Sequence, residues 1–153
     1  MTNKDLTIVI TTYFSEEKIE NCLNSIDSDI KVIIIENSKN QKFKNYIENK
    51  FSNTECILAN DNLGYGKANN IGLKMVKTKY ALILNPDTTL HKEAIKKFFN
   101  FLEKNNNFAF LGPIQNYDKI DIKKYNHDTS NAYEVESIKG FAIFINMSKL
   151  PRI

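Results

Sequence analysis

Short apolar runs alternate along the chain with segments in which apolar residues recur at helical spacing. The runs that predict strands cover residues 6–10, 32–35, 56–58, 80–84, 109–111 and 140–145. Helices are predicted between them, at about 16–26, at 43–51, from about 67 onward and over 94–102. This alternation is typical of β/α units that feed a mostly parallel sheet with helices on both faces, so the pattern predicts an α/β fold.

Two of the predicted helices carry local signals. Ser15 is expected to cap the first helix, because its side chain can accept from an unpaired amide of the first turn. In the third helix we expect Ala68 and Ile71 to face the core. Gly72 in the same helix lacks a Cβ and should allow a close approach to another backbone.

Composition narrows the class of protein. A chain of 153 residues with 42% hydrophobic content can bury the core of one domain. The net charge of +3 is spread among acidic residues and asparagines, so no nucleic-acid binding is expected. Cys22 and Cys56 lie in apolar patterns, which favours buried, reduced thiols. No apolar run approaches the roughly 20 residues that span a bilayer, which favours a cytoplasmic protein.

The candidate chemistry follows the predicted strands. Residues 82–89 join an apolar strand to a proline turn that presents Asp87, and open α/β sheets bind ligands at such strand ends. Asp87 could hold Mg²⁺ or Mn²⁺ through one oxygen, with a diphosphate and water completing the shell, or it could form an Asx turn or cap. Glu36 follows the second strand and could accept from a ribose hydroxyl or a base N–H, or be a solvated turn residue.

Glycines precede the third helix, where backbone could approach a base or a phosphate, although glycines also suit a simple turn. The segment 64–66 does not follow the first strand, and Asn69 stands where a dinucleotide fingerprint requires its third glycine. The segment 66–68 lacks the Ser or Thr of a phosphate loop. A dinucleotide-dependent oxidoreductase and a phosphate-loop enzyme are therefore excluded.

Five ordered motifs within about residues 6–113 resemble the inverting family 2 glycosyltransferases, which have a GT-A (Rossmann-like) fold. The motifs are Ile8-Val9-Ile10-Thr11-Thr12-Tyr13, Cys22-Leu23-Asn24-Ser25-Ile26, Ile34-Ile35-Glu36-Asn37-Ser38, residues 62–72 and Leu84-Asn85-Pro86-Asp87-Thr88. The last of them is similar to the bacterial rhamnosyltransferase branch. The resemblance implies transfer with inversion from dTDP-rhamnose or a UDP-sugar to a surface glycan or lipid-linked glycan acceptor.

The resemblance also implies roles for particular residues. The implied nucleotide-sugar site consists of Thr12, Tyr13, Glu36, Asn62, Gly64, Asn69 and Asp87. Asp87 would be the metal ligand, for Mg²⁺ or Mn²⁺. Two departures from the family pattern matter. Glu36 stands where an aspartate is usual, which would alter base selectivity, and Asn85 replaces the first acid of an acidic pair, which would weaken metal affinity.

The C-terminal part departs further from the resemblance. Family members continue past the strand at 140–145 into a segment with the catalytic acid, and no residue here matches the general base. Asp128 and His127 are the substitutes within the chain, although a surface role is favoured for both. We expect one domain over 1–153, with a donor-binding part at 1–113 and the start of an acceptor part at 114–153. Without the acceptor segment, it is expected to transfer sugar poorly or not at all.

Two other classes stay open. The chain could be a nucleotide-binding or regulatory module without turnover, or a receiver-like interaction domain, although residues 11–13 lack the acidic pair that a receiver expects. Apolar surface left uncovered near Phe141 and Phe144 would promote a homo-oligomer. The expected setting is cytoplasmic, with peripheral contact at the inner face of the cell membrane.

Overall fold

The computed structural model describes residues 1–105, 107–113 and 135–150. The strands are β1 Leu6–Thr12, β2 Lys31–Glu36, β3 Thr54–Leu58, β4 Tyr80–Leu84, β5 Phe110–Leu111 and β6 Ala142–Asn146. The α-helices are α1 Glu16–Asn24, α2 Gln41–Lys50, α3 Gly64–Met75 and α4 Ala94–Lys104, and the 3₁₀-helices are η1 Asn3–Asp5 and η4 Met147–Lys149.

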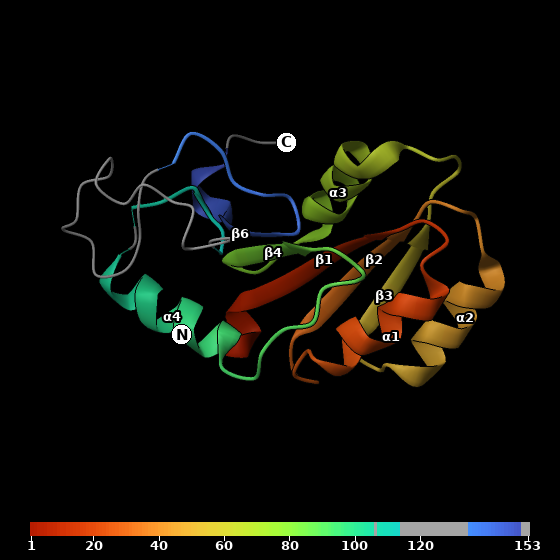
Figure 1. Ribbon diagram of the computed structural model, residues 1–153, viewed down its shortest axis with the longest axis horizontal. Helices are drawn as coiled ribbons and strands as arrows, with labels where there is room; N and C mark the ends of the chain where they lie inside the picture. The colour runs from red at the N-terminus through yellow and green to blue at the C-terminus, as the bar shows by residue number, and fades with distance from the viewer. Residues whose placement is uncertain (106, 114–134, 151–153) are drawn as a thin grey trace, which may run out of the picture.

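The strands form one six-stranded sheet in the order β3-β2-β1-β4-β6-β5 (Figure 1). Neighbours from β3 to β4 are parallel, whereas β6 is antiparallel to both β4 and β5. The chain moves outward from β1 to β3 and then returns to the other side of β1 with β4. This reversal makes a topological switch point between β1 and β4, and open α/β sheets bind ligands at the carboxyl ends of the strands there. The predicted mostly parallel α/β fold is confirmed.

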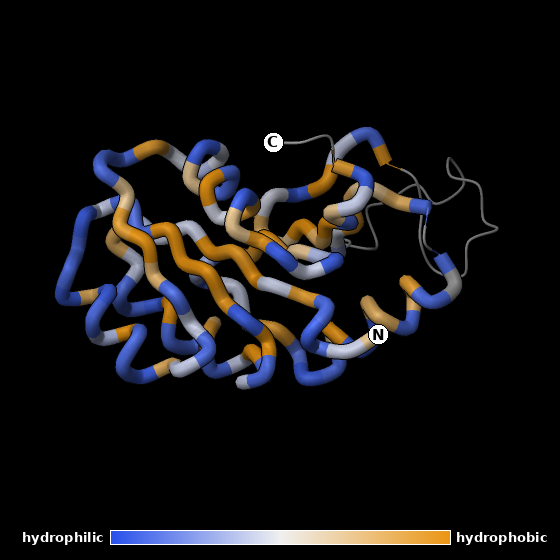
Figure 2. The backbone as a smooth tube through the Cα atoms, turned by 180° about the vertical axis from the view of Figure 1, so that it is seen from behind, coloured by the Kyte–Doolittle hydropathy of each residue, from blue (hydrophilic) through white to orange (hydrophobic). Residues whose placement is uncertain are grey.

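Helices cover both faces of the sheet. α1, α2 and α4 lie on one face and α3 lies on the other (Figure 1). Because successive side chains of a strand point to opposite faces, Ile8 and Ile10 join the core under α1 and α4, whereas Val9 packs with Leu73 of α3. Figure 2 shows the result as apolar strands enclosed by helices in which hydrophilic and hydrophobic residues alternate.

α3 differs from the prediction in its start and in its buried face. The helix begins at Gly64, earlier than predicted, and Ile71 is 36% exposed instead of facing the core. Gly72 explains the orientation, because a Cβ at this position would lie 2.4 Å from Val9 Cγ1. The helix therefore turns its glycine toward β1. The approach at Gly72 is close, but it is to the side chains of Val9 and Ile35 and not to another backbone, as was predicted.

Two smaller expectations hold only in part. Ser15 is the N-cap residue of α1, as predicted, but its Oγ donates to the Tyr13 carbonyl at 3.1 Å and accepts from the Tyr13 amide at 3.2 Å, so its side chain makes no capping hydrogen bond. Phe144 is fully buried, with its ring stacked on Phe98 at 5.0 Å, and Phe141 is partly buried against the same core. Phe144 therefore contributes no surface for self-association.

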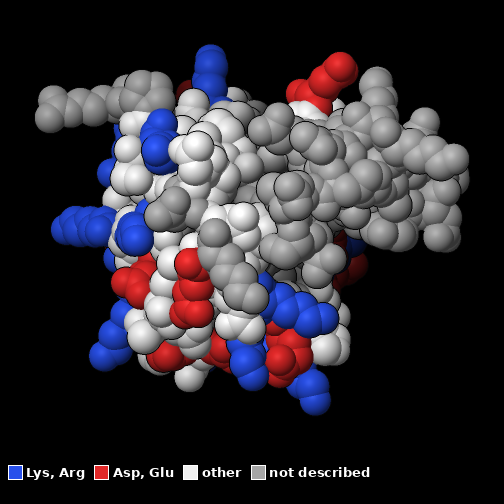
Figure 3. Space-filling model, turned by 90° about the vertical axis from the view of Figure 1, so that its left-hand side faces the viewer, with Lys and Arg blue, Asp and Glu red and all other residues white. Residues whose placement is uncertain are grey.

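The surface charge is mixed. On the face shown in Figure 3, acidic and basic side chains are interspersed wherever the surface is described. Within the described ranges, no helix has both the length and the apolar character needed to cross a membrane.

Candidate functional site

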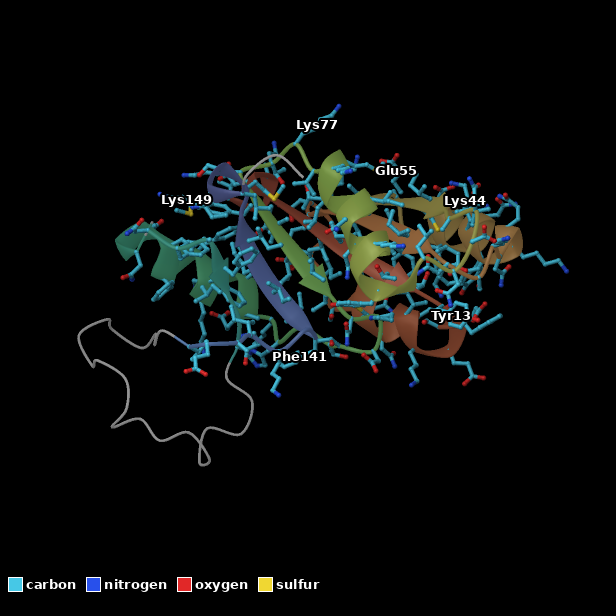
Figure 4. All side chains as sticks on the ribbon, turned by 90° about the horizontal axis from the view of Figure 1, so that it is seen from above. Tyr13, Lys44, Glu55, Lys77, Phe141 and Lys149 are labelled. Atoms are coloured by element: carbon cyan, nitrogen blue, oxygen red, sulfur yellow. The ribbon has the colours of Figure 1, made fainter. Side chains whose placement is uncertain are left out.

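Several loops meet at the carboxyl edge of the parallel strands, which we call the strand-end site. β1 ends at Thr12 and β2 at Glu36, and these two residues are paired in the parallel register. β6 is antiparallel, so its start lies beside the end of β4. Tyr13 and Phe141 accordingly lie at the same end of the sheet in Figure 4. All seven residues predicted for the site come from the elements at this edge. Thr12 and Glu36 end their strands, and the loops carry Tyr13, Asn62 and Asp87, while α3 carries Gly64 and Asn69.

Glu36 is the centre of a buried hydrogen-bond network. The residue is 1% exposed, and Thr12 Oγ1 donates to its Oε2 at 2.5 Å. The Ser38 amide donates to Oε1 at 2.5 Å, and the Ser38 hydroxyl donates to the same oxygen. Hydrogen bonds to a charged acceptor are stronger than neutral ones, so this network fixes the loops after β1 and β2 relative to each other. A carboxylate offers about four acceptor sites, which leaves capacity for a ligand donor.

Tyr13 and Phe14 form an exposed aromatic surface after β1. Tyr13 is 51% exposed and Phe14 is 69% exposed, and their rings meet edge to face at 4.5 Å. Phe14 has a φ of 47°, a left-handed conformation that is uncommon for a bulky residue. Such strain clusters at functional sites, and flat aromatic rings suit the face of a nucleotide base.

Asn62 and Gly64 shape the turn into α3. Asn62 Oδ1 accepts from the Gly64 amide at 3.0 Å, and Gly64 has a φ of 71°, where glycine has no Cβ penalty. From the loop after β2, Asn37 Oδ1 accepts from the Leu63 amide at 3.4 Å. Asparagines from two loops therefore fix the start of α3 over the edge of the sheet.

Tyr65, in the first turn of α3, links the helix to the turn before β6. Its hydroxyl donates to the Gly140 carbonyl. Burial raises the pKa of Tyr65. The hydroxyl therefore stays protonated and able to donate, and the link closes one side of the strand-end site.

Two buried amide atoms at this edge have no hydrogen-bond partner. Asn69 is 2% exposed, and its Oδ1 accepts from Thr11 Oγ1 at 2.9 Å while its Nδ2 is unpaired. Asn85 Oδ1 is the other such atom among the residues that the structure describes. Because buried polar atoms are nearly always paired, one unpaired donor and one unpaired acceptor at the same edge point to a bound polar ligand.

Asp87 lies at the tip of a turn after β4. The Thr88 amide donates to the Asn85 carbonyl at 3.1 Å, which closes the turn and leaves the Asp87 carboxylate exposed. No group of three or more His, Cys, Asp or Glu side chains that could hold a metal occurs in the described part of the chain. Asp87 could hold a cation here if a diphosphate and water completed its shell.

The Cys22 thiol lies behind this turn and is predicted to be unreactive. Burial raises the pKa of Cys22 to about 12, with a further rise from Asp87, and burial also raises that of Cys56 to about 12. Because the thiolate is the nucleophile, iodoacetamide at about pH 8 should label neither cysteine in the folded chain, and both after unfolding in urea. Rapid labelling of Cys22 in the folded chain would show instead that α1 and the Asp87 turn separate.

A surface hollow of about 380 Å³ lies away from this edge, beside β5 and β6, and its lining residues are Phe110, Val135, Glu136, Ser137, Ile138 and Ile143. It holds one carboxylate and otherwise mostly apolar side chains, whereas the unpaired polar atoms lie at the strand-end site.

Four residues that the sequence analysis gave no role belong to the strand-end site. They are Thr11, Phe14, Ser38 and Tyr65, each bonded or packed against a predicted site residue or against the turn before β6. The signal available in the sequence was their type: each is polar or aromatic and directly adjoins a predicted strand end or the glycine-rich turn.

The family of the chain agrees with this geometry. The model of Glycosyl transferase family 2 matches residues 7–149, and the chain belongs to this family. Low-salt glycan biosynthesis hexosyltransferase Agl10 from Haloferax volcanii is 26% identical over 125 residues, which cover 78% of this chain and 40% of Agl10. The chain spans between 19% and 40% of the length of the curated relatives that it matches.

Two solved structures share the fold. S. aureus TarS 1-349 in complex with UDP has a TM-score of 0.69 at 19% identity, over 94% of this chain and 47% of that chain. Mannosyltransferase PcManGT from Pyrobaculum calidifontis, in complex with GDP-Man and Mn²⁺, has a TM-score of 0.73 at 10% identity, over 93% and 44%. At these identities the likeness shows the GT-A-like fold alone.

Proposed function

We propose that the strand-end site binds a nucleoside diphosphate sugar and that this chain contributes the donor half of a glycosyltransferase. The observation that carries the proposal is the pair of unpaired buried atoms, Asn69 Nδ2 and Asn85 Oδ1, at the edge that holds Asp87. A nucleoside diphosphate offers acceptor oxygens for the first atom and brings a cation that suits the second. Membership of Glycosyl transferase family 2 supports the same assignment.

In this proposal each loop binds a different part of the donor. Tyr13 and Phe14 provide the surface for the base, and Glu36 accepts from the base or the ribose. Asp87, with the amide oxygen of Asn85, faces the diphosphate. A divalent cation bound there would neutralise the charge that develops on the departing diphosphate.

Transfer with inversion needs a further group. A base must take the proton of the acceptor hydroxyl while that oxygen attacks the sugar from the side opposite the diphosphate. The two substitutes suggested by the sequence, His127 and Asp128, lie outside the described residues. We therefore assign donor binding to residues 1–113 and the start of the acceptor part to 114–153, and we propose sugar transfer for the whole protein.

For the donor we propose dTDP-rhamnose or a UDP-sugar, and for the acceptor a surface glycan or lipid-linked glycan. The turn from Asn85 to Thr88 supports rhamnose through its similarity to the rhamnosyltransferase branch. The UDP in the TarS structure and the Mn²⁺ and GDP-Man in the PcManGT structure support a metal-assisted nucleotide site. The name of Agl10 refers to glycan biosynthesis, which supports a glycan acceptor. We also propose that the protein acts in the cytoplasm, with contact at the inner face of the cell membrane.

Calorimetric titration tests this function. Purified chain would be titrated with dTDP, UDP, GDP and NAD, each with and without Mn²⁺. We expect one pyrimidine nucleoside diphosphate to bind more tightly with Mn²⁺ and NAD not to bind. If none of the nucleotides binds, the proposed function is wrong. Nucleotide binding without sugar transfer by the whole protein would favour a non-catalytic nucleotide-binding module.

A further inference from the structure

The loop that carries Asp87, residues 85–90, is held at both ends by the C-terminal part of α1 and its C-cap residue, Ser25. At its start, the Cys22 thiol donates to the Asn85 carbonyl at 3.6 Å. At its end, the Leu90 amide donates to Ser25 Oγ at 2.9 Å. Cys22 and Ser25 are three residues apart, a spacing that places two side chains on the same face of a helix. Side chains from one face at the end of α1 therefore form hydrogen bonds with both ends of one short loop.

Further hydrogen bonds fix the ends of the same loop. Ser25 Oγ donates to the Cys22 carbonyl at 2.6 Å, which leaves its lone pairs for the Leu90 amide. The Asn85 carbonyl takes a second donor, the Thr88 amide at 3.1 Å, and the Asn85 amide donates to the Phe141 carbonyl at 2.9 Å. The loop ends are thus fixed by hydrogen bonds, while Asp87 between them stays exposed.

We infer that Cys22 and Ser25 are positioning residues that hold the Asp87 carboxylate in place for a diphosphate and its cation. A group that is already in position costs less ordering entropy when its ligand arrives, so affinity rises without any new contact to the ligand. This inference rests on the proposed function, because the position of Asp87 matters to affinity only if a ligand binds there. It also gives a role to residues 22–26, one of the five motifs of the family resemblance, to which the sequence assigned no function.

Nucleotide affinity in Ser25 and Cys22 variants tests the inference. We expect Ser25→Ala to reduce the strengthening of UDP or dTDP binding by Mn²⁺ about fivefold, the usual weight of one neutral hydrogen bond. Affinity without Mn²⁺ should be unchanged. Ser25→Thr keeps the hydroxyl and should restore the parent value, which a role in helix packing alone does not predict. Cys22→Ala should act in the same direction as Ser25→Ala.

Cys56→Ala is the matched control. Cys56 is also a buried free cysteine, but it lies in β3, separated from β4 by β2 and β1. Its substitution therefore removes a buried thiol without touching the Asp87 loop. An equal loss of the Mn²⁺ effect in Cys56→Ala and Cys22→Ala would overturn the role of Cys22 and assign the loss to general destabilisation.

Hydrogen exchange adds a readout that needs no ligand. Ser25→Ala should speed exchange of the Leu90 amide in the free protein, while amides of β1 exchange at the parent rate. Unchanged Mn²⁺ dependence in both Ser25→Ala and Cys22→Ala would overturn this inference and leave the proposed function standing. If Mn²⁺ does not change the nucleotide affinity of the parent chain, Asp87 has no metal role and this inference is wrong as well.

Discussion

Alanine in place of Asp87 should weaken Mn²⁺-dependent binding of the nucleoside diphosphate about 100-fold, at the upper end of the effects seen when groups around a metal are removed. Asp87 supplies the one exposed carboxylate of the turn after β4, and Asn85 beside it contributes only a neutral oxygen. Binding in the absence of Mn²⁺ should change little. Calorimetric titration with and without Mn²⁺, on the variant and the parent, measures both numbers.

Asp61→Ala is the control for this substitution. Asp61 is also an exposed aspartate in a loop after a strand, and it pairs with Lys39 at 2.7 Å. Exposed pairs contribute little, so its loss should alter neither folding nor the Mn²⁺ effect. If Asp87→Ala kept the Mn²⁺ dependence of the parent, Asp87 would not be a metal ligand, and an Asx turn or cap would be its role.

Alanine in place of Gly72 should destabilise the fold by about 2 kcal/mol, within the range for overpacked cores. The new Cβ would lie 2.4 Å from Val9 Cγ1 and 3.5 Å from Ile35 Cγ1, so α3 would have to move away from the sheet. Val9 is fully buried and β-branched and has little freedom to turn aside. Urea unfolding, with the slope compared between variants, measures the change.

Gly66→Ala separates packing from helix propensity. A Cβ on Gly66 meets nothing within 4 Å, so this substitution in the same helix should be neutral or stabilise by up to about 1 kcal/mol. The double variant with Val9→Ala and Gly72→Ala should lose less stability than the sum of the two single losses, because Val9→Ala removes the methyl that the Cβ at position 72 would meet. Equal effects of Gly66→Ala and Gly72→Ala would contradict the close-packing argument.

The order of the elements could be predicted because it depends on local pattern. The strands are apolar almost throughout, as parallel strands covered on both faces are, and their predicted positions agree closely with the structure. The buried face of α3 could not be predicted in the same way. Its orientation depends on where Gly72 meets Val9, and these two residues are far apart in the sequence.

The location of the candidate site at the strand ends could be predicted from the sequence. The hydrogen bonds within the site could not. Topology brings the loops after parallel strands to one edge, so Glu36 and Asp87 could be expected there. The bond from Thr12 to Glu36 depends on how β1 and β2 pair, which no local pattern contains. For the same reason, Glu36 seemed a free carboxylate in the sequence, whereas Thr12 and Ser38 hold it in the structure.

The strand-end site can form only when β1 and β2 pair in the register that places Thr12 beside Glu36. A slip of one residue between β1 and β2 would turn every side chain of one strand to the opposite face, and the buried carboxylate would lose its hydroxyl partner. Misregistered chains would therefore lack the nucleotide surface altogether. A ligand that binds only the correctly paired form draws the population toward it by mass action, so a nucleotide bound as proposed would also stabilise the correctly folded chain.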